Sequence, residues 1–261
     1  MYGLGVNKLG VNNTADPIAK LFADGSEGAW YDPSDLSTLF QEDGTTPAGV
    51  NDPVGKILDK SGNGNHMVQT TLTKCPILRR DTDLYYLDFD GVDDGLKTFT
   101  TIDFSGTDAM SVFAGARKTV NDANQNVVEL SNSVGSNNGA FRLFYVSTNV
   151  WRSIMKGTTA NTISTATVTS ELNKSVLTVT ADISDPSHSF RRNGSSVASN
   201  TNSLGTGNFG NYLMNMGSRN GGASSVLNGD VYGLVVLGKK ATDSEVAAVE
   251  SYMARKSGVS I

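Results

Sequence analysis

Apolar and polar residues alternate along most of this chain in short runs, as they do in antiparallel strands with one buried face. The segment LYYLDFDGVDDGL shows the alternation clearly, because Leu87 and Phe89 fall on one face. Tyr86, Asp88 and Asp90 fall on the other face. An Asp-Gly step follows directly and supplies a turn. The pattern predicts a half-buried strand that ends at this turn.

Similar runs of ~5–9 residues recur through the rest of the chain, separated by clusters of turn-forming residues. They are MSVFAGARK, VVELSN, FRLFYVS, WRSIMK, SVLTVTADI, HSFRRNG and VYGLVVLG. The composition agrees, since the 28 glycines suit a chain with many turns. We therefore predict an all-β fold, a two-sheet antiparallel jelly-roll sandwich.

One segment near the C-terminus has the features of a helix. Thr242 is a suitable N-cap, and Glu245 completes a capping box. Basic residues in the last turn and Gly258 after it are typical of a helix end. We predict a helix over 242–257 and a weaker, short one over 34–40.

The first 24 residues differ from the remainder of the chain. The sequence LGVN occurs twice there and places Leu4, Val6, Leu9 and Val11 at equivalent positions. Low-complexity drift would explain such a repeat, and so would a docking element. We predict a docking arm over 1–24 and a sandwich over 25–261 that includes the C-terminal helix.

Charge, cysteine content and hydropathy exclude several classes of protein. The formal net charge is −5 and the 21 basic residues are scattered, which does not suit a nucleic-acid partner. The single cysteine, Cys75, excludes an internal disulfide framework. There is no secretory signal pattern and no apolar stretch of ~18 residues. We expect a protein made in a cytoplasm, with neither nucleic acid nor membrane as partner.

Five segments together resemble a known superfamily. They are LDKSGNGNH at 58–66, YLDFDGVDDGL at 86–96, MSVFAGARK, HSFRRNG at 188–194 and GDVYGLVVLGKKATDSEVAAVESYMARK at 229–256. Over about 28–258 the chain resembles the concanavalin A-like lectin/glucanase superfamily, and in particular its laminin-G-like jelly rolls. The resemblance implies the fold and not the function, because this fold serves lectins, glycosidases, adhesive modules and viral structural proteins.

The N-terminal part of the sandwich, WYDPSDLSTLFQEDGTTPAGVNDPVGKILDKSGNGNH, is most similar to proteins encoded among the structural genes of tailed phages. This resemblance implies a location in the virion, with residues 1–24 docked on other virion proteins. It also implies several symmetric copies, because virion parts repeat with the symmetry of the particle. A host-surface glycan is then a further expected partner.

No catalytic group is predicted. Glycosidases use two facing carboxylates, and the E-x-D-x-(x)-E strand of the superfamily's glucanases does not occur here. Glu129 lies in a predicted strand, where we expect it to face solvent. We expect His66 and His188 to lie in polar turns, with His66 matching a hydrogen-bonded turn residue of the superfamily.

Two kinds of binding site are considered. Asp93 and Asp94 belong to an acidic turn that could hold calcium, although Val92 and Phe99 occupy positions where an EF-hand needs ligands. The same acidic residues also fit a plain Asp-Gly turn, and no cofactor is otherwise expected.

Aromatic side chains that could stack on a sugar are Trp151, Tyr145 and Tyr212. Large aromatics in sandwiches are also often buried.

The predicted function is a non-enzymatic virion surface protein, a capsid decoration or tail component that presents a lectin-like module. The alternatives are a stand-alone carbohydrate-binding module and, less favoured, a glycoside hydrolase.

Overall fold

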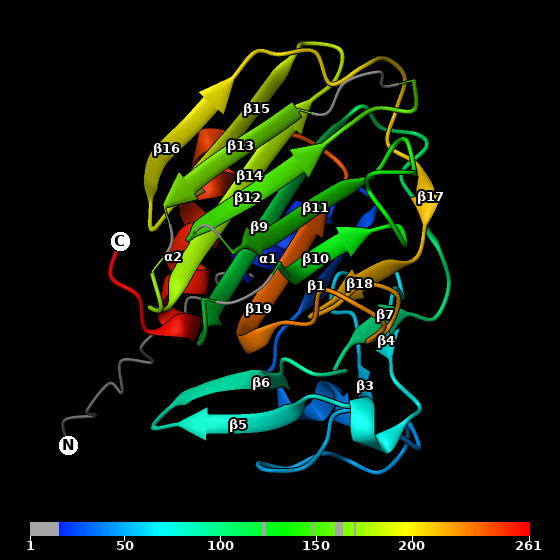
Figure 1. The fold of residues 1–261 in the computed structure, drawn as a ribbon, viewed down its shortest axis with the longest axis vertical. Helices are drawn as coiled ribbons and strands as arrows, with labels where there is room; N and C mark the ends of the chain where they lie inside the picture. Colours follow the sequence, from blue (N-terminus) through cyan, green and yellow to red (C-terminus); the bar gives the residue numbers. More distant parts are fainter. Residues whose placement is uncertain (1–15, 122–123, 148, 160–163, 170) are drawn as a thin grey trace, which may run out of the picture.

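Two antiparallel sheets pack face to face in the computed structural model, which describes residues 16–121, 124–147, 149–159, 164–169 and 171–261 (Figure 1). The predicted jelly-roll sandwich with a C-terminal helix is confirmed. The strands of the first sheet are, in spatial order, β16 (Ser195–Asn200), β15 (Ser187–Arg192), β14 (Ser175–Asp182), β9 (Ala109–Lys118), β19 (Asn228–Leu237), β6 (Leu84–Asp90) and β5 (Ile77–Asp81), with β1 (Gly28–Tyr31) also paired to β19.

The second sheet carries the surface on which the candidate binding site lies. Its strands are, in spatial order, β13 (Ser164–Thr169), β12 (Val150–Met155), β11 (Phe141–Val146), β10 (Gln125–Leu130), β18 (Met214–Met216), β7 (Leu96–Thr98), β4 (Met67–Val68), β3 (Lys56–Ile57) and β2 (Leu39–Phe40). A separate two-stranded ribbon joins β8 (Ile102–Asp103) to β17 (Asn211–Tyr212).

Alternation along the strands builds the main core between the sheets. Leu87 and Phe89 of β6 point into it, as their spacing predicts. Central strands such as β9 and β19 are buried on both faces, because a second apolar cluster covers the outer face of the first sheet. Their sequences therefore read as continuous apolar runs and do not alternate.

The second cluster is formed by two helices. α2 (Asp243–Ser257) has the predicted capping box at Thr242 and ends at Gly258, which adopts a left-handed conformation. α1 (Pro17–Leu21) packs beside it with Ile18 fully buried. The predicted short helix over 34–40 is wrong, because this stretch holds only a 3₁₀ turn at Leu36–Thr38 and then enters β2. A second 3₁₀ turn occurs at Leu72–Lys74. No helix in the described ranges is long and apolar enough to span a membrane.

Only the end of the predicted N-terminal arm falls within the described residues. There, α1 belongs to the body of the sandwich, because its apolar residues join the cluster beneath α2. Leu4, Val6, Leu9 and Val11 lie outside the described residues, and docking through them stays a prediction.

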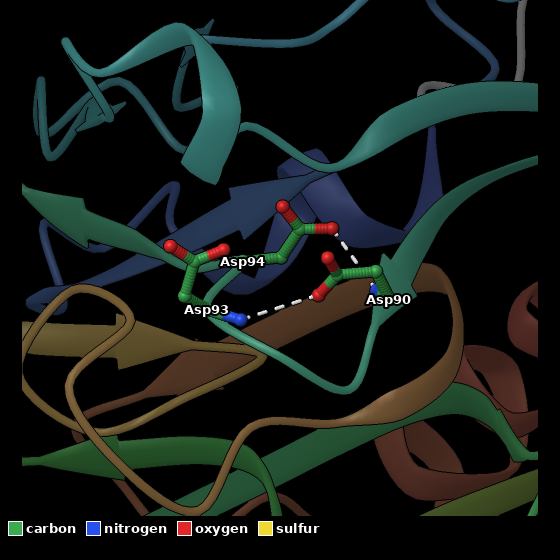
Figure 2. A group of neighbouring side chains, drawn as sticks. All are labelled: Asp90, Asp93 and Asp94. Carbon is green, nitrogen blue, oxygen red and sulfur yellow. Dashed lines mark hydrogen bonds between the residues drawn. The ribbon is translucent and has the colours of Figure 1, made fainter.

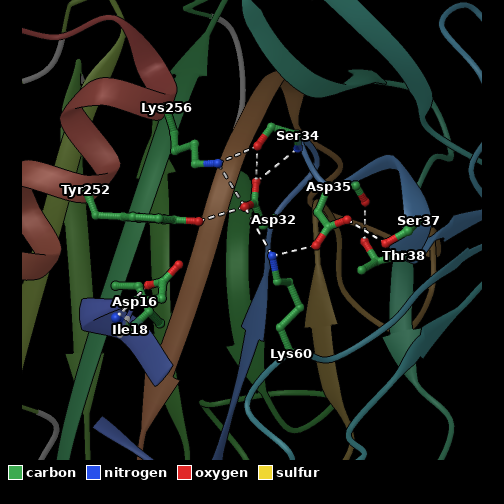
Figure 3. Close-up of polar contacts among 10 residues, drawn as sticks. All are labelled: Asp16, Ile18, Asp32, Ser34, Asp35, Ser37, Thr38, Lys60, Tyr252 and Lys256. Atoms are coloured by element: carbon green, nitrogen blue, oxygen red, sulfur yellow. Dashed lines mark hydrogen bonds and ion pairs between the residues drawn. The ribbon is translucent and has the colours of Figure 1, made fainter. Parts of the chain in front are cut away.

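A buried carboxylate joins α2 to the first strand (Figure 3). The Oδ1 atom of Asp32 accepts hydrogen bonds from the backbone N–H and the hydroxyl of Ser34. Its Oδ2 atom accepts from the Tyr252 hydroxyl at 2.7 Å and from Lys256 Nζ at 2.9 Å. Burial raises the pKa of Asp32, but these hydrogen bonds outweigh it and hold the pKa below its ordinary value. Asp32 is therefore an ionised anchor for the C-terminal helix.

Candidate functional site

Three carboxylates meet in the turn between β6 and β7 (Figure 2). One oxygen from each of Asp90, Asp93 and Asp94 lies within 4.8 Å of the others. Asp90 Oδ1 accepts from the Val92 and Asp93 backbone N–H groups, and Asp94 Oδ2 accepts from Asp90 N–H. These bonds close the turn, so the acidic residues have a structural role whether or not a cation binds.

The chemistry of the cluster fits a hard cation in part. Calcium takes six to eight oxygen ligands, and the three carboxylates supply some of them from one turn. Burial raises the pKa of Asp94 to about 7, and the neighbouring carboxylates act in the same direction. A cation would remove this penalty by favouring the ionised form. Calcium binding at Asp93 and Asp94 stays a prediction, and the structure adds Asp90 to the residues that could bind the ion.

Replacing Asp94 with asparagine should stabilise the protein at pH 8 in a chelator, by ~1–2 kcal/mol. The folded pKa of this acid is raised above its unfolded value. Ionisation between pH 4 and 8 therefore costs stability in the wild type and not in the variant. Thermal unfolding at several pH values checks this: the two stabilities should converge near pH 4. If the difference in stability between the variant and the wild type were the same at pH 5 and at pH 8, the prediction would be contradicted. Adding calcium should stabilise only the wild type if a cation site exists.

The structure corrects the sugar-stacking role that the sequence predicted for two of the three aromatic residues. Trp151 and Tyr145 are fully buried in the main core, where their rings pack edge to face at 5.9 Å. Neither ring can meet a sugar there. Both lie on the inward face of their strands, which the local sequence did not reveal. Tyr212 is partly exposed and lines a small surface pocket of about 210 Å³, so its proposed role stays a prediction.

Two polar residues expected at the surface are also buried. Glu129 is 0% exposed on β10 and pairs with Arg142 at 3.2 Å and Arg219 at 2.5 Å. His188 lies inside the sandwich on β15 and not in a turn; its Nε2 shares a hydrogen bond of 2.8 Å with the Ser153 hydroxyl. Burial lowers the pKa of His188 to about 4, so it is a neutral core residue at pH 7.

A pocket of about 520 Å³ opens beside the exposed ring of Phe99, at the β3–β4 side of the second sheet. Phe99 is 78% exposed, an unusual position for a large aromatic. Its place follows from the pairing of β4 with β7, since the Phe99 N–H donates to the His66 carbonyl. We call this hollow the Phe99 pocket.

Hydrogen-bonding groups surround the ring in the Phe99 pocket. Glu42 contributes a carboxylate whose Oε2 is buried and has no hydrogen-bond partner among the residues that the structure describes. His66 accepts the Asp59 N–H at Nδ1, which leaves Nε2 as the donor of the neutral ring. This bond confirms the predicted hydrogen-bonded role of His66. Lys56 and several threonines complete the lining. An apolar ring with convergent polar groups is the usual makeup of a small-molecule site.

Sequence reasoning missed Phe99 and Glu42. Phe99 lies between threonines in the run KTFTT, where a lone aromatic among polar residues at a strand end was the available signal. The sequence around Glu42 carries no such signal, because the position of Glu42 depends on a contact with Gly55. A side chain at Gly55 would approach the Glu42 backbone to 2.3 Å, so only glycine permits this contact.

Comparison with known proteins supports the fold. No protein family and no curated protein matches the sequence. Among solved structures, the binding domain of Botulinum neurotoxin DC in complex with rat synaptotagmin II aligns with a TM-score of 0.59 at 11% identity, over 88% of this chain and 52% of that chain. The binding domain of serotype G gives a TM-score of 0.56 at 12% identity, over 76% and 49%. The chain thus spans about half of these domains.

Sialidases from two bacteria show partial likeness. The CBM40 of the Ruminococcus gnavus IT-sialidase, bound to alpha2,3 sialyllactose, aligns with a TM-score of 0.45 at 14% identity, over 63% of this chain and 97% of that chain. The NanB sialidase from Streptococcus pneumoniae aligns with a TM-score of 0.44 at 17% identity, over 56% of this chain and 26% of that chain.

Proposed function

We propose that this protein is a non-enzymatic, lectin-like module that binds glycans at the Phe99 pocket. The observation that carries the proposal is the exposed Phe99 ring in a pocket that Glu42 and His66 also line. A sugar ring presents C–H groups on one face and hydroxyls around its edge. The aromatic ring suits the C–H face, and Glu42 with His66 suits the hydroxyls.

The same pocket argues for binding and against hydrolysis. Its second carboxylate, Asp43, accepts hydrogen bonds from Thr45 and Thr46, and those from Thr46 lower its pKa to about 2. An acid held ionised in this way is a poor proton donor. Both of its oxygens also accept hydrogen bonds within their own turn, which makes it a poor nucleophile or base. Glu42 is then left without the second carboxylate that glycoside hydrolysis requires.

Replacing Phe99 with alanine should weaken glycan affinity by ~10-fold or more, which corresponds to ~1.4 kcal/mol of stacking. An array of immobilised glycans, with sialyllactose included, first identifies a ligand of the wild type. Isothermal titration calorimetry then compares the variants. Folding should be unaffected, since the ring is exposed. Val92→Ala is the matched control, because Val92 is 74% exposed but lies in the β6–β7 turn. Equal affinities of Phe99→Ala and Val92→Ala would contradict the proposal.

We place this module on the surface of a tailed-phage virion, as a capsid decoration or tail component attached through residues 1–24. The support is the resemblance of residues 30–66 to phage structural proteins. Quantitative mass spectrometry of purified particles tests the placement. A fixed ratio to the shell protein would indicate a decoration, and a few copies per particle a tail component. Absence from particles would contradict a virion role and leave a stand-alone carbohydrate-binding module.

A further inference from the structure

We propose that the glycan is a linear, neutral oligosaccharide which crosses the second sheet through three adjoining pockets. This inference rests on the proposed function and adds the class of ligand. The Phe99 pocket, of about 520 Å³, adjoins a second pocket of about 450 Å³, and both are lined by Val68, Thr70 and Phe99. The second adjoins the Tyr212 pocket, of about 210 Å³, through Leu213. A single sugar unit would leave most of this surface empty.

The register of the strands explains why the three pockets are continuous. Phe99 N–H donates to the His66 carbonyl, and Ser131 N–H donates to the Leu213 carbonyl. In the antiparallel pairing of β18 with β7, Asn215 lies opposite Lys97. The same register, continued by two residues, places Leu213 opposite Phe99. His66, Phe99, Leu213 and Ser131 therefore form one row across the sheet.

This row faces away from the core. The strand neighbours Met67, Thr98, Met214 and Leu130 are buried on the opposite face. Residues opposite one another in neighbouring strands share a face, and the row crosses strands ~4.7–4.9 Å apart. The pockets thus follow a path perpendicular to the strands, which suits an extended ligand better than a compact one.

The charges along the path balance. Glu42 and Asp43 are opposed by Lys56 in the same pocket and by Lys97 in the next. The other polar lining residues are mainly uncharged threonines, asparagines, serines and a glutamine. A polyanionic ligand would need an excess of cations. The lining is suited to hydroxyl groups, and hence to a neutral polymer of sugars.

The walls of the path are held in place by buried polar groups. Glu129 accepts the Val134 N–H, and Asn215 Nδ2 donates to the Ser131 carbonyl. Asn215 Oδ1 also accepts the Gly221 N–H, which fixes the loop beside the second pocket. Loops fixed in this way need little further ordering when a ligand binds, and this preserves affinity.

Calorimetry with neutral oligosaccharides of increasing length tests the inference. The probes are cello-, malto- and laminari-oligosaccharides from mono- to hexasaccharide, with sialyllactose and hyaluronan oligomers as charged comparisons. We expect at least one neutral series to gain ~10-fold or more in affinity from disaccharide to hexasaccharide. Equal affinity for short and long members, or tightest binding of a charged probe, would overturn the inference.

Variants at the far end of the path give an independent readout. Asn132 and Asn211 are exposed and line the Tyr212 pocket, so the double variant Asn132→Ala/Asn211→Ala should fold normally. It should weaken hexasaccharide binding and leave disaccharide binding unchanged, whereas Phe99→Ala weakens both. If binding depends on Phe99 but its affinity is the same for short and long oligosaccharides, only the present inference is overturned. Binding of no glycan at all would also overturn the proposed function.

Discussion

Replacing Glu129 with glutamine should lower the free energy of unfolding by ~3–5 kcal/mol. The carboxylate is buried between the guanidinium groups of Arg142 and Arg219, and Arg142 is itself buried. Removing one member of a buried ion pair leaves the other charges without compensation. Burial already lowers the pKa of Arg142 to about 10, which shows how costly its charge is at this site. Urea unfolding at pH 7 measures the change.

A surface ion pair provides the control for Glu129. Glu171 lies 3.7 Å from Arg192 and its side chain is 58% exposed. The Glu171→Gln variant should change stability by less than ~1 kcal/mol. A similar, small effect of both substitutions would show that the Glu129 cluster is not a structural ion pair. Because Glu129 also holds the loop at Val134, its variant should bind long oligosaccharides more weakly.

Replacing Asp32 with alanine should destabilise the protein by ~3 kcal/mol and loosen the attachment of α2. The substitution leaves the buried Tyr252 hydroxyl without its acceptor and removes an ion pair with Lys256 (Figure 3). The folded pKa of Asp32 is lowered, so its contribution is present above its unfolded pKa of ~3.9 and is lost as pH falls through the folded pKa. The wild type should therefore lose its advantage over the variant in strong acid.

Asp35 is the matched control for Asp32 because it lies in the same network. It pairs with Lys60 at 2.7 Å, but both side chains are partly exposed. Thermal unfolding and hydrogen exchange of the α2 amides should show little change in Asp35→Ala. A loss in Asp35→Ala as large as in Asp32→Ala, or unchanged α2 exchange in Asp32→Ala, would contradict the anchoring role.

Local signals in the sequence were sufficient for the elements and the fold class. Thr242 and Glu245 make contacts within one helical turn, so the capping box could be identified without tertiary information. The alternation around Leu87 and Phe89 likewise indicated which face of β6 is buried. Short partners such as β18 carry too few residues for a period to be recognised.

Burial on both faces of a strand could not be inferred from alternation. On β10 every residue is buried, because loops cover the outer face of the sheet and supply Arg219 to Glu129. His188 was assigned to a polar turn, although it lies on the buried face of β15 and faces Ser153 between the sheets. Trp151 lies close to the polar residues Asn149 and Arg152, which suggested an exposed face, but its side chain is buried in the main core.

The binding site depends on contacts between distant segments. Phe99, Glu42 and His66 are brought together by pairing among β2, β3, β4 and β7, whose strands are only two or three residues long. The register across four strands determines that Phe99 points outward. Sequence alone therefore predicted a binding role for Tyr212, which lines the pocket at one end of the proposed path, but it did not predict the Phe99 pocket.

The most direct test of glycan binding at this site is an NMR titration of the isotope-labelled protein with the tightest neutral oligosaccharide. The account predicts chemical-shift changes that are centred on Phe99 and His66 and extend through Leu213 towards Tyr212. The Phe99→Ala variant should show much smaller changes at the same ligand concentrations. Changes centred on another surface, or saturable binding that Phe99→Ala leaves intact, would contradict the assignment of the site.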